Sequence, residues 1–230
     1  MPKSLLSHTM NTRDLGGHPT LSGGYTRCNR FLRSDLPTGL SENDVSLLRR
    51  KSITTVIDLR SIHEKMNTPS FFENRPGFEY RHCPLSGDGK RPPTEEEIPA
   101  SYLAMLCGSS VIFDIMKIFA DTDTGFLFHC TAGKDRTGVI AALLLSLAEV
   151  PMPDILADYQ ISYPNIRPMV DQLRSADPAL PAWVGQSKPE YLSAFLSSFQ
   201  QKYQSIENYL LHLGLSAHDI RSIQSKLVSA

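Results

Sequence analysis

Cys130 and Arg136 stand six positions apart in the string HCTAGKDRTG, which lies between two apolar segments. The residues GFLF before it are typical of a short buried strand, and VIAALLLSLA after it is long enough for a buried helix. The string therefore predicts a tight loop that joins the end of a strand to the start of a helix. The amides of such a loop can converge on one point and bind an anion, helped by the positive end of the helix dipole.

The residue types at the two ends of this loop indicate a reaction at a bound phosphate. The loop amides and the helix dipole favour the thiolate form of Cys130, which is the reactive form of a cysteine. Arg136 can place a planar guanidinium on two phosphate oxygens at once. The expected reaction is therefore attack of the thiolate on phosphorus, formation of a thiophosphate intermediate and hydrolysis of that intermediate.

The full string HCTAGKDRTG resembles the signature loop of the cysteine-dependent protein tyrosine phosphatase superfamily. Two further stretches, NTRDLGG from residue 11 and DLRSIHE from residue 58, resemble motifs of one bacterial-type branch of atypical tyrosine and dual-specificity phosphatases, some of which also act on phosphoinositides. The resemblance runs in patches from residue 11 to residue 228, and only the loop is highly specific. The nucleotide-binding P-loop is the nearest competing motif, but Phe128 and Asp135 stand where it needs Gly and Ser or Thr.

The resemblance assigns roles to the residues of the loop. Cys130 is the expected nucleophile, and Arg136 is the expected phosphate clamp. The remaining positions are expected to bind the phosphate group of the substrate, and they are Thr131, Ala132, Gly133, Lys134 and Thr137. Thr137 could hydrogen-bond the sulfur or merely cap the helix. His129 matches the His-Cys pair of the family and is expected to orient the loop through hydrogen bonds.

A general acid is also needed, because the leaving oxygen takes up a proton and the attacking water later gives one away. The chain has no WPD-type string, from which many superfamily members take this group. The resemblance points to Asp135 inside the loop, and Asp88 in a Gly-rich segment is the second candidate. Asp135 could instead pair with Arg136 or Lys134 and hold the loop.

Other residues near the expected site have two interpretations each. Asp58 and Arg60 follow a strand whose C-terminal end is expected to face the ligand, so they could bind substrate or form an ion pair that closes the strand end. In this branch a lysine at the position of Lys134 accompanies activity on phosphoinositides, and an exposed lysine without a role is the alternative. Pro181 and Trp183 could form an apolar lid over an aromatic substrate or a satellite hydrophobic cluster.

The pattern of apolar residues predicts an α/β fold with a central mixed, mostly parallel sheet flanked by helices, and a helical C-terminal addition. Residues 1–230 are expected to form a single phosphatase domain, in which the helical part 163–230 could act as a lid. A hairpin or pair of short strands is expected at 25–34, and further strands are expected at 53–60, at 78–85 and before Cys130. Helices are expected at 41–50, 98–106, 109–121, 136–149, 151–162, 188–201, 203–213 and 216–228, with short helices from 164 and a loop at 177–188.

The composition is that of a soluble globular protein without bulk affinity for nucleic acid or membranes. Hydrophobic residues make up 41% of the 230 residues, charged residues make up 20%, and the net charge is −1 without a long basic block. The cysteines form no CxxC pair and fit a reducing compartment, and they are Cys28, Cys83, Cys107 and Cys130. No leader and no membrane-spanning stretch is visible, so a cytoplasmic location is expected, although secretion without a leader stays compatible with the sequence.

Together these features predict a phosphomonoester hydrolase that uses neither a cofactor nor a metal. A phosphotyrosyl protein is the first-choice substrate, and a phosphoinositide or a phosphoserine/phosphothreonine protein is the second. A phosphate-binding module without activity is one rival, but it has no use for Cys130, Asp135 and Arg136 together. A rhodanese-type sulfurtransferase also uses a loop cysteine, but it leaves Arg136 unexplained.

Overall fold

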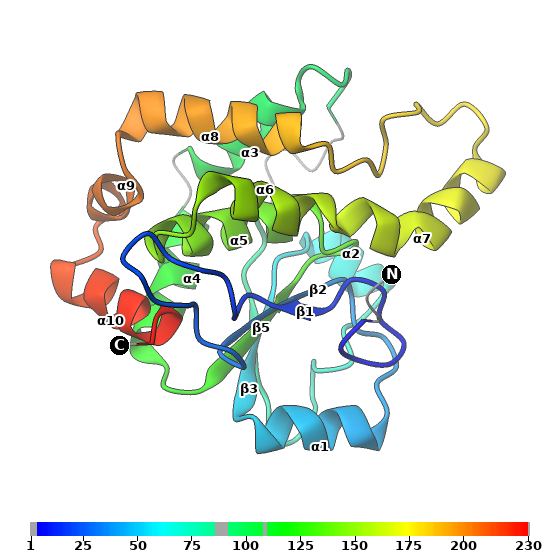
Figure 1. The fold of residues 1–230 in the computed structure, drawn as a ribbon. Coiled ribbons are helices and arrows are strands. Elements are labelled where there is room, and N and C mark those ends of the chain that lie inside the picture. Colours follow the sequence, from blue (N-terminus) through cyan, green and yellow to red (C-terminus); the bar gives the residue numbers. More distant parts are fainter. Residues whose placement is uncertain (1–3, 86–91, 108–109, 230) are drawn as a thin grey trace.

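The computed structural model describes residues 4–85, 92–107 and 110–229, and a single sheet lies at its centre (Figure 1). The sheet contains five strands in the order β1-β2-β5-β3-β4. β1 pairs with β2 in antiparallel orientation, and the other neighbouring strands are parallel. The bounds are β1 Arg13–Asp14, β2 Phe31–Ser34, β3 Ile53–Asp58, β4 Glu79–His82 and β5 Gly125–His129. The predicted mixed, mostly parallel sheet is confirmed.

Helices cover both faces of this sheet, with α1 on one face and α5, α6 and α8 stacked over the other (Figure 1). Their bounds are α1 Glu42–Arg50, α2 Ile62–Asn67, α3 Ile98–Leu106, α4 Ser110–Asp121, α5 Asp135–Leu147, α6 Met152–Gln160, α7 Ser162–Ala176, α8 Pro189–Tyr203, α9 Ile206–Leu213 and α10 Ala217–Leu227. Within the described ranges, no single helix is long and apolar enough to cross a membrane, and only α3 and α4 taken together as a bent pair meet that length and composition.

The central strand β5 is buried from both sides. Phe126 and Phe128 belong to a large hydrophobic core that includes α5, whereas Leu127 belongs to a smaller core with Leu48 of α1. This division follows from the alternation of side chains along a strand. Burial on both faces is typical of parallel strands that helices cover on each side. The strand that leads to Cys130 is therefore held firmly in place.

α5 is apolar all round because the sheet and other helices enclose it. Every residue from Thr137 to Leu145 is buried, and the helix contacts β2, β5, α3, α6 and α9. The helix begins at Asp135, which is earlier than the sequence suggested. Asp135 and Arg136 therefore project from the first turn of the helix, and the loop proper consists of the residues from Cys130 to Lys134.

The helices after residue 162 share the core of the sheet. Phe195 of α8, Tyr209 of α9 and Ile223 of α10 lie in the same hydrophobic core as Phe128 of β5. α8 packs against α3, and α10 packs against α4. The helical C-terminal part is thus confirmed, while its role as a lid stays a prediction.

Three local elements differ from the prediction. Segment 25–34 contains one strand, β2, at its end, while Tyr25 makes an isolated bridge to Pro19 and Thr26 makes one to the distant Val228. The short helix α2 was missed, although Ser61 and Glu64 close its first turn in a reciprocal capping box. Short helices were expected after residue 164, but α7 is one continuous helix that accommodates Pro168 in its interior.

Candidate active site

β5 places Cys130 at the edge of the sheet where the parallel strands end. β2 and β3 end beside it, with Ser34 and Asp58 both in register with His129. Cys130 is 2% exposed and is followed by the loop and by the first turn of α5. The predicted unit of strand, loop and helix is present, with the helix N-terminus close behind the cysteine in the chain.

Two side chains from outside the loop hold its carbonyl groups. The Nδ2 atom of Asn11 donates to the carbonyl oxygens of Ala132 and Gly133, each at 3.0 Å. The Nη2 atom of Arg33 donates to the carbonyl oxygen of Gly133 at 2.8 Å. In a trans peptide the carbonyl and the N–H point in opposite directions. The amides of Gly133 and Lys134 are therefore directed away from Asn11 and Arg33, as an anion-binding loop requires.

Gly133 is required by the backbone of the loop. Its φ is +65°, a left-handed conformation that residues with a side chain rarely adopt. A Cβ atom there would lie 2.5 Å from the amide nitrogen of Asp35 and 2.6 Å from the carbonyl carbon and oxygen of Ser34. The loop can approach the end of β2 this closely only because residue 133 is a glycine.

A buried ion network supports Arg33 in turn. Its guanidinium pairs with Asp158 of α6, and the Nε atom of Arg13 lies 2.7 Å from the other carboxylate oxygen of Asp158. Burial raises the pKa of Asp158, but the charges of Arg33 and Arg13 outweigh it and lower the pKa to about 2. Arg13 also donates to the backbone carbonyl of Asn11 at 3.2 Å. The NTRDLGG stretch therefore contributes the support beneath the loop.

Glu64 of α2 holds Arg136 in a bidentate ion pair. The Nη1 and Nη2 atoms of Arg136 lie 2.6 and 2.7 Å from its two carboxylate oxygens, and the hydroxyl of Thr131 donates to the same group at 2.6 Å. Burial raises the pKa of Glu64, but Arg136 and Thr131 outweigh it and bring the pKa well below its usual range. Glu64 therefore stays ionised and fixes the plane of the guanidinium.

We expect Glu64→Gln to weaken the site without abolishing it. The amide can accept one hydrogen bond from Arg136 but cannot match its fork or its charge, so kcat/KM should fall by about 10- to 100-fold. The matched control is Glu73→Gln, which removes a partly exposed carboxylate. Glu73 pairs with Lys65, which lies in α2 next to Glu64. Steady-state kinetics on an aryl phosphate would show this difference, and equal behaviour of the two variants would mean that Glu64 does not position Arg136.

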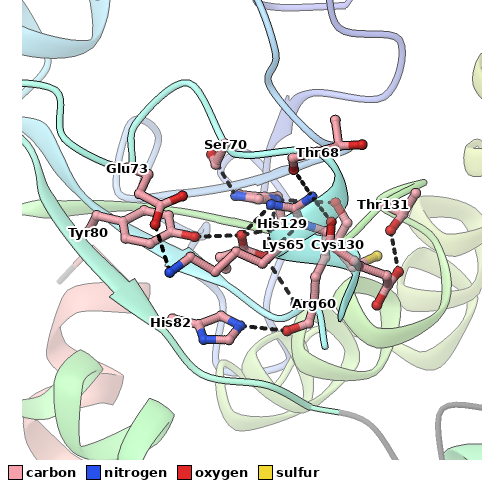
Figure 2. A network of polar contacts seen from close by, with 12 residues as sticks. Arg60, Lys65, Thr68, Ser70, Glu73, Tyr80, His82, His129, Cys130 and Thr131 are labelled. Atoms are coloured by element: carbon pink, nitrogen blue, oxygen red, sulfur yellow. Dashed lines mark hydrogen bonds and ion pairs between the residues drawn. The ribbon is translucent and has the colours of Figure 1, made fainter. Parts of the chain in front are cut away.

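Asp58 and Arg60 form a buried ion pair with each other, and Figure 2 shows Arg60 within the surrounding polar network. The Nη2 atom of Arg60 lies 2.7 Å from Asp58, Tyr80 donates to Asp58 at 2.7 Å, and Arg60 also donates to the carbonyl of Thr68 at 2.6 Å. Burial raises the pKa of Asp58, but the hydrogen bonds from Arg60 and Tyr80 outweigh it and lower the pKa to about 2. This geometry corresponds to an ion pair that closes the strand end, and substrate binding by these two residues stays a prediction.

His129 is fully buried and lies beside Cys130 (Figure 2). Its Nδ1 atom lies 3.1 Å from the carbonyl oxygen of Cys130, and its Nε2 atom lies 3.3 Å from the hydroxyl of Ser70. Burial lowers the pKa of His129, so the ring is neutral near neutral pH. A neutral ring carries one N–H, and because a carbonyl oxygen can only accept, Nδ1 donates to Cys130 and Nε2 accepts from Ser70. This arrangement orients the start of the loop, as the sequence led us to expect.

Asp135 lies in the first turn of α5 with its side chain 41% exposed. Its Oδ1 atom is 3.2 Å from the ammonium of Lys134, and it accepts a hydrogen bond from the hydroxyl of Tyr102. Of the two pairs expected as the alternative role of Asp135, the one with Lys134 is present, whereas Arg136 pairs with Glu64 instead. The second candidate for the general acid, Asp88, lies outside the described residues.

Lys134 and Thr137 are both buried. The ammonium of Lys134 donates to the backbone carbonyl of Gln186 at 2.6 Å, in the segment between α7 and α8. The alternative of an exposed lysine is therefore wrong, since Lys134 is 5% exposed. The hydroxyl of Thr137 has no hydrogen-bond partner within the part of the chain that the structure describes. Trp183 of the same segment packs against the main core.

Sequence reasoning missed the residues that act on the loop from a distance. Glu64 could have been found, because Ser61 and Glu64 have capping-box spacing directly after the expected strand. Asn11 stood in a recognised motif without an assigned task, and Arg33 gave no local signal. Among the described residues, no group of three or more His, Cys, Asp or Glu side chains is arranged to hold a metal ion.

The site thus combines a cysteine, a tight loop and a fixed arginine at the end of a parallel strand. This combination is typical of the cysteine-dependent phosphatases. Residues 5–229 match the sequence pattern of the tyrosine phosphatase family, and the chain belongs to this family. A tyrosine-protein phosphatase of Nostoc commune is 30% identical over 222 residues, which cover 87% of this chain and 74% of that protein.

Two further similarities are more distant. The triple specificity protein phosphatase PtpB of Mycobacterium tuberculosis is 29% identical over 119 residues, which cover 44% of this chain and 43% of that protein. The catalytic domain of the PP-IP phosphatase SIW14 of S. cerevisiae, solved with citrate, is 17% identical with a TM-score of 0.42, over 87% of this chain and 94% of that one.

Proposed function

We propose that this protein hydrolyses phosphomonoesters through a phosphocysteine intermediate on Cys130, with phosphotyrosyl proteins as its first substrate class. The observation that carries the proposal is the pre-set geometry around Cys130. Asn11 and Arg33 hold the loop from one side, and Glu64 holds Arg136 on the other. Donors fixed before the substrate binds cost no reorganisation during the reaction, which is where electrostatic catalysis is strongest.

The reaction has two steps. The sulfur of Cys130 forms a bond to phosphorus while the bond from phosphorus to the ester oxygen breaks, and that oxygen takes the proton of Asp135. Water then attacks the phosphocysteine and gives a proton to the carboxylate of Asp135. Phosphate leaves, and the thiolate of Cys130 is restored. Arg136 stabilises the charge on the equatorial oxygens in both steps.

The other predicted loop residues bind the phosphate oxygens mainly through their backbone. The amides that follow Ala132 and Gly133 are the ones turned away from the loop support, and Thr131 uses its hydroxyl on Glu64. A buried hydroxyl without a partner is costly. The hydroxyl of Thr137 makes no hydrogen bond to Cys130 or to another described residue, so its predicted bond to the sulfur would have to form during the reaction, where it would stabilise the thiolate of Cys130 as it departs.

Dual specificity and phosphoinositide hydrolysis form the second candidate function. The name of the distant relative PtpB favours a broad substrate range, and Lys134 would supply extra charge for further phosphates. Lys134 would first have to release the carbonyl of Gln186. We also propose a cytoplasmic location, which is supported by the four unpaired cysteines, since disulfides are rare in reducing compartments.

Release of phosphate by the purified protein tests the proposed function. A phosphotyrosyl peptide is expected to be turned over faster than a panel of phosphoinositides and phosphoseryl peptides. The same preparation should form no thiocyanate from thiosulfate and cyanide, which is the rhodanese reaction. Tight phosphate binding without turnover would instead identify a phosphate-binding module.

Asp135→Asn tests the general acid. The amide keeps the size of the side chain but delivers no carboxyl proton, so the rate on phenyl phosphate should fall by roughly 10²–10⁴-fold. The loss should shrink on 2,4-dinitrophenyl phosphate, whose phenolate leaves without help. The alkaline limb of the pH–rate profile should weaken, while the acidic limb should be retained because it reports the thiolate.

The control for this variant is Asp154→Asn, which removes a carboxylate from the first turn of α6 instead of α5. It should behave like the unchanged protein on both substrates. An equal loss on good and poor leaving groups in Asp135→Asn would identify a structural carboxylate. Asp88→Asn and Asp58→Asn, compared in the same way, would then show which residue supplies the proton.

A further inference from the structure

Two buried tyrosine hydroxyls form a chain that ends on Asp135. Tyr102 of α3 donates to the Oδ1 atom of Asp135, and the hydroxyls of Tyr102 and Tyr159 lie 2.7 Å apart. Each tyrosine is 1% exposed. A phenol has a single proton to donate. Since Tyr102 gives its proton to Asp135, Tyr159 of α6 must donate to Tyr102.

Both phenols keep their protons under working conditions. Burial, followed by the charge of Asp135, raises the pKa of Tyr102 and that of Tyr159 well above their usual range. The rings are also in edge-to-face contact, with centroids 6.3 Å apart. The two tyrosines are therefore a fixed donor chain in the core and not a second pair of titrating groups.

The contacts of Asp135 are not shared evenly between its two oxygens. Tyr102 donates to Oδ1, and the ammonium of Lys134 is 3.2 Å from the same atom. In a protonated carboxyl group, the oxygen that accepts hydrogen bonds is the carbonyl oxygen, and the other oxygen carries the proton. Within the described part of the chain, these contacts leave Oδ2 as the oxygen that carries the proton of Asp135.

We propose that Tyr102, supported by Tyr159, is a positioning residue that fixes the rotamer of Asp135 and presents the proton on Oδ2 to the leaving oxygen. The inference rests on the proposed role of Asp135 as general acid. The side chain of Asp135 is 41% exposed, and an exposed side chain samples several rotamers unless a contact selects one. Proton transfer depends on such alignment, because a displaced donor loses much of its effect.

Several charged and titratable groups surround this carboxylate, so the role of the hydroxyl must be separated from theirs. Lys134 and Arg136 face it from the loop and α5, and Tyr102 faces it from α3. Behind Tyr102 lies Tyr159, whose further neighbours are Arg33 of β2 and Tyr191 of α8. Replacing tyrosine by phenylalanine removes a hydroxyl and leaves every one of these charges in place.

Tyr102→Phe is expected to lower catalysis selectively. The rate on phenyl phosphate should fall by about tenfold, with little change on 2,4-dinitrophenyl phosphate, because only the first substrate needs the proton. Tyr159→Phe should lower the rate on phenyl phosphate by less.

Tyr209→Phe is the matched control. Tyr209 is fully buried and donates to the carbonyl of Leu106 at 3.0 Å, so the variant removes a buried hydroxyl bound to the end of the same helix α3. It should leave the rates on both substrates unchanged, and a comparable melting temperature of the three variants would show that each is folded.

The outcomes separate this inference from the function on which it rests. An equal loss on both substrates in Tyr102→Phe, or no loss on phenyl phosphate, would overturn the positioning role while the unchanged protein still releases phosphate. A loss in Asp135→Asn that does not depend on the leaving group would overturn it too, since there would be no acid to position. Absence of phosphate release by the unchanged protein would overturn the proposed function itself.

Discussion

Replacing Cys130 by serine is expected to reduce turnover of a phosphotyrosyl peptide by about 10⁴-fold or more, because the hydroxyl is a far weaker nucleophile than the thiolate. Binding of inorganic phosphate should be largely retained. The donors that bind it are held by Asn11, Arg33 and Glu64, which the substitution leaves intact. Turnover and phosphate affinity, measured on the same preparation, check the two halves of this expectation.

Two controls accompany this variant. Cys28→Ser removes an exposed, unpaired cysteine and should leave turnover unchanged. EDTA should not affect the unchanged protein, whose mechanism assigns no step to a metal. Activity of Cys130→Ser within tenfold of the unchanged protein would end the covalent mechanism, and activity lost in EDTA and restored by a divalent metal would contradict the metal-free reaction.

Arg136→Lys should be the second most damaging change, with a loss in kcat of about 10³-fold even though the positive charge is kept. Lysine offers a compact ammonium in place of a planar fork. A lysine can bind either Glu64 or the phosphate oxygens. The guanidinium of Arg136 can do both, because each of its terminal nitrogens donates one N–H to Glu64 and keeps a second N–H for the phosphate. The transition state should therefore lose its aligned donors.

Arg75→Lys serves as the comparison for this substitution. Arg75 pairs with Glu42 at the surface, where the shape of the cation matters little. Its kinetic constants should equal those of the unchanged protein. Near-normal catalysis by Arg136→Lys would place Arg136 outside the reaction, and a large loss in Arg75→Lys would show that the effect is not specific to the site.

The parts of the site that sequence predicts are those encoded within one short segment. Cys130 and Arg136 are joined by a loop between a buried strand and a buried helix, and each of those elements has its own apolar signal. The sheet was predictable for the same reason, since β3 and β5 are apolar runs with turn residues around them. The burial of Lys134 was less predictable, because it depends on a contact with the backbone of Gln186, which lies far along the chain.

The residues that hold the site in shape come from distant segments, and no spacing rule connects them. Asn11 reaches Gly133, Glu64 reaches Arg136, and Tyr102 reaches Asp135 only after the sheet and helices have packed. Glu64 left a weak signal because its capping box with Ser61 is local. A tyrosine in an apolar helix looks like an ordinary core residue, so the hydroxyl chain was invisible in the sequence.

The ion pairs beneath the loop also determine how the protein tolerates acid. Asp58 and Asp158 have their pKa lowered to about 2 by their arginine partners, despite burial. A carboxylate with a lowered pKa in the folded state stabilises it fully above its unfolded pKa of about 3.9, and this stability is lost only as the pH falls from there through about 2. Protonation of these two carboxylates is therefore thermodynamically silent between about pH 5 and 8. The buried group that makes the scaffold sensitive to pH in that interval is His129, whose lowered pKa in the folded state means that the unfolded chain takes up a proton first as the pH falls below about 6.5.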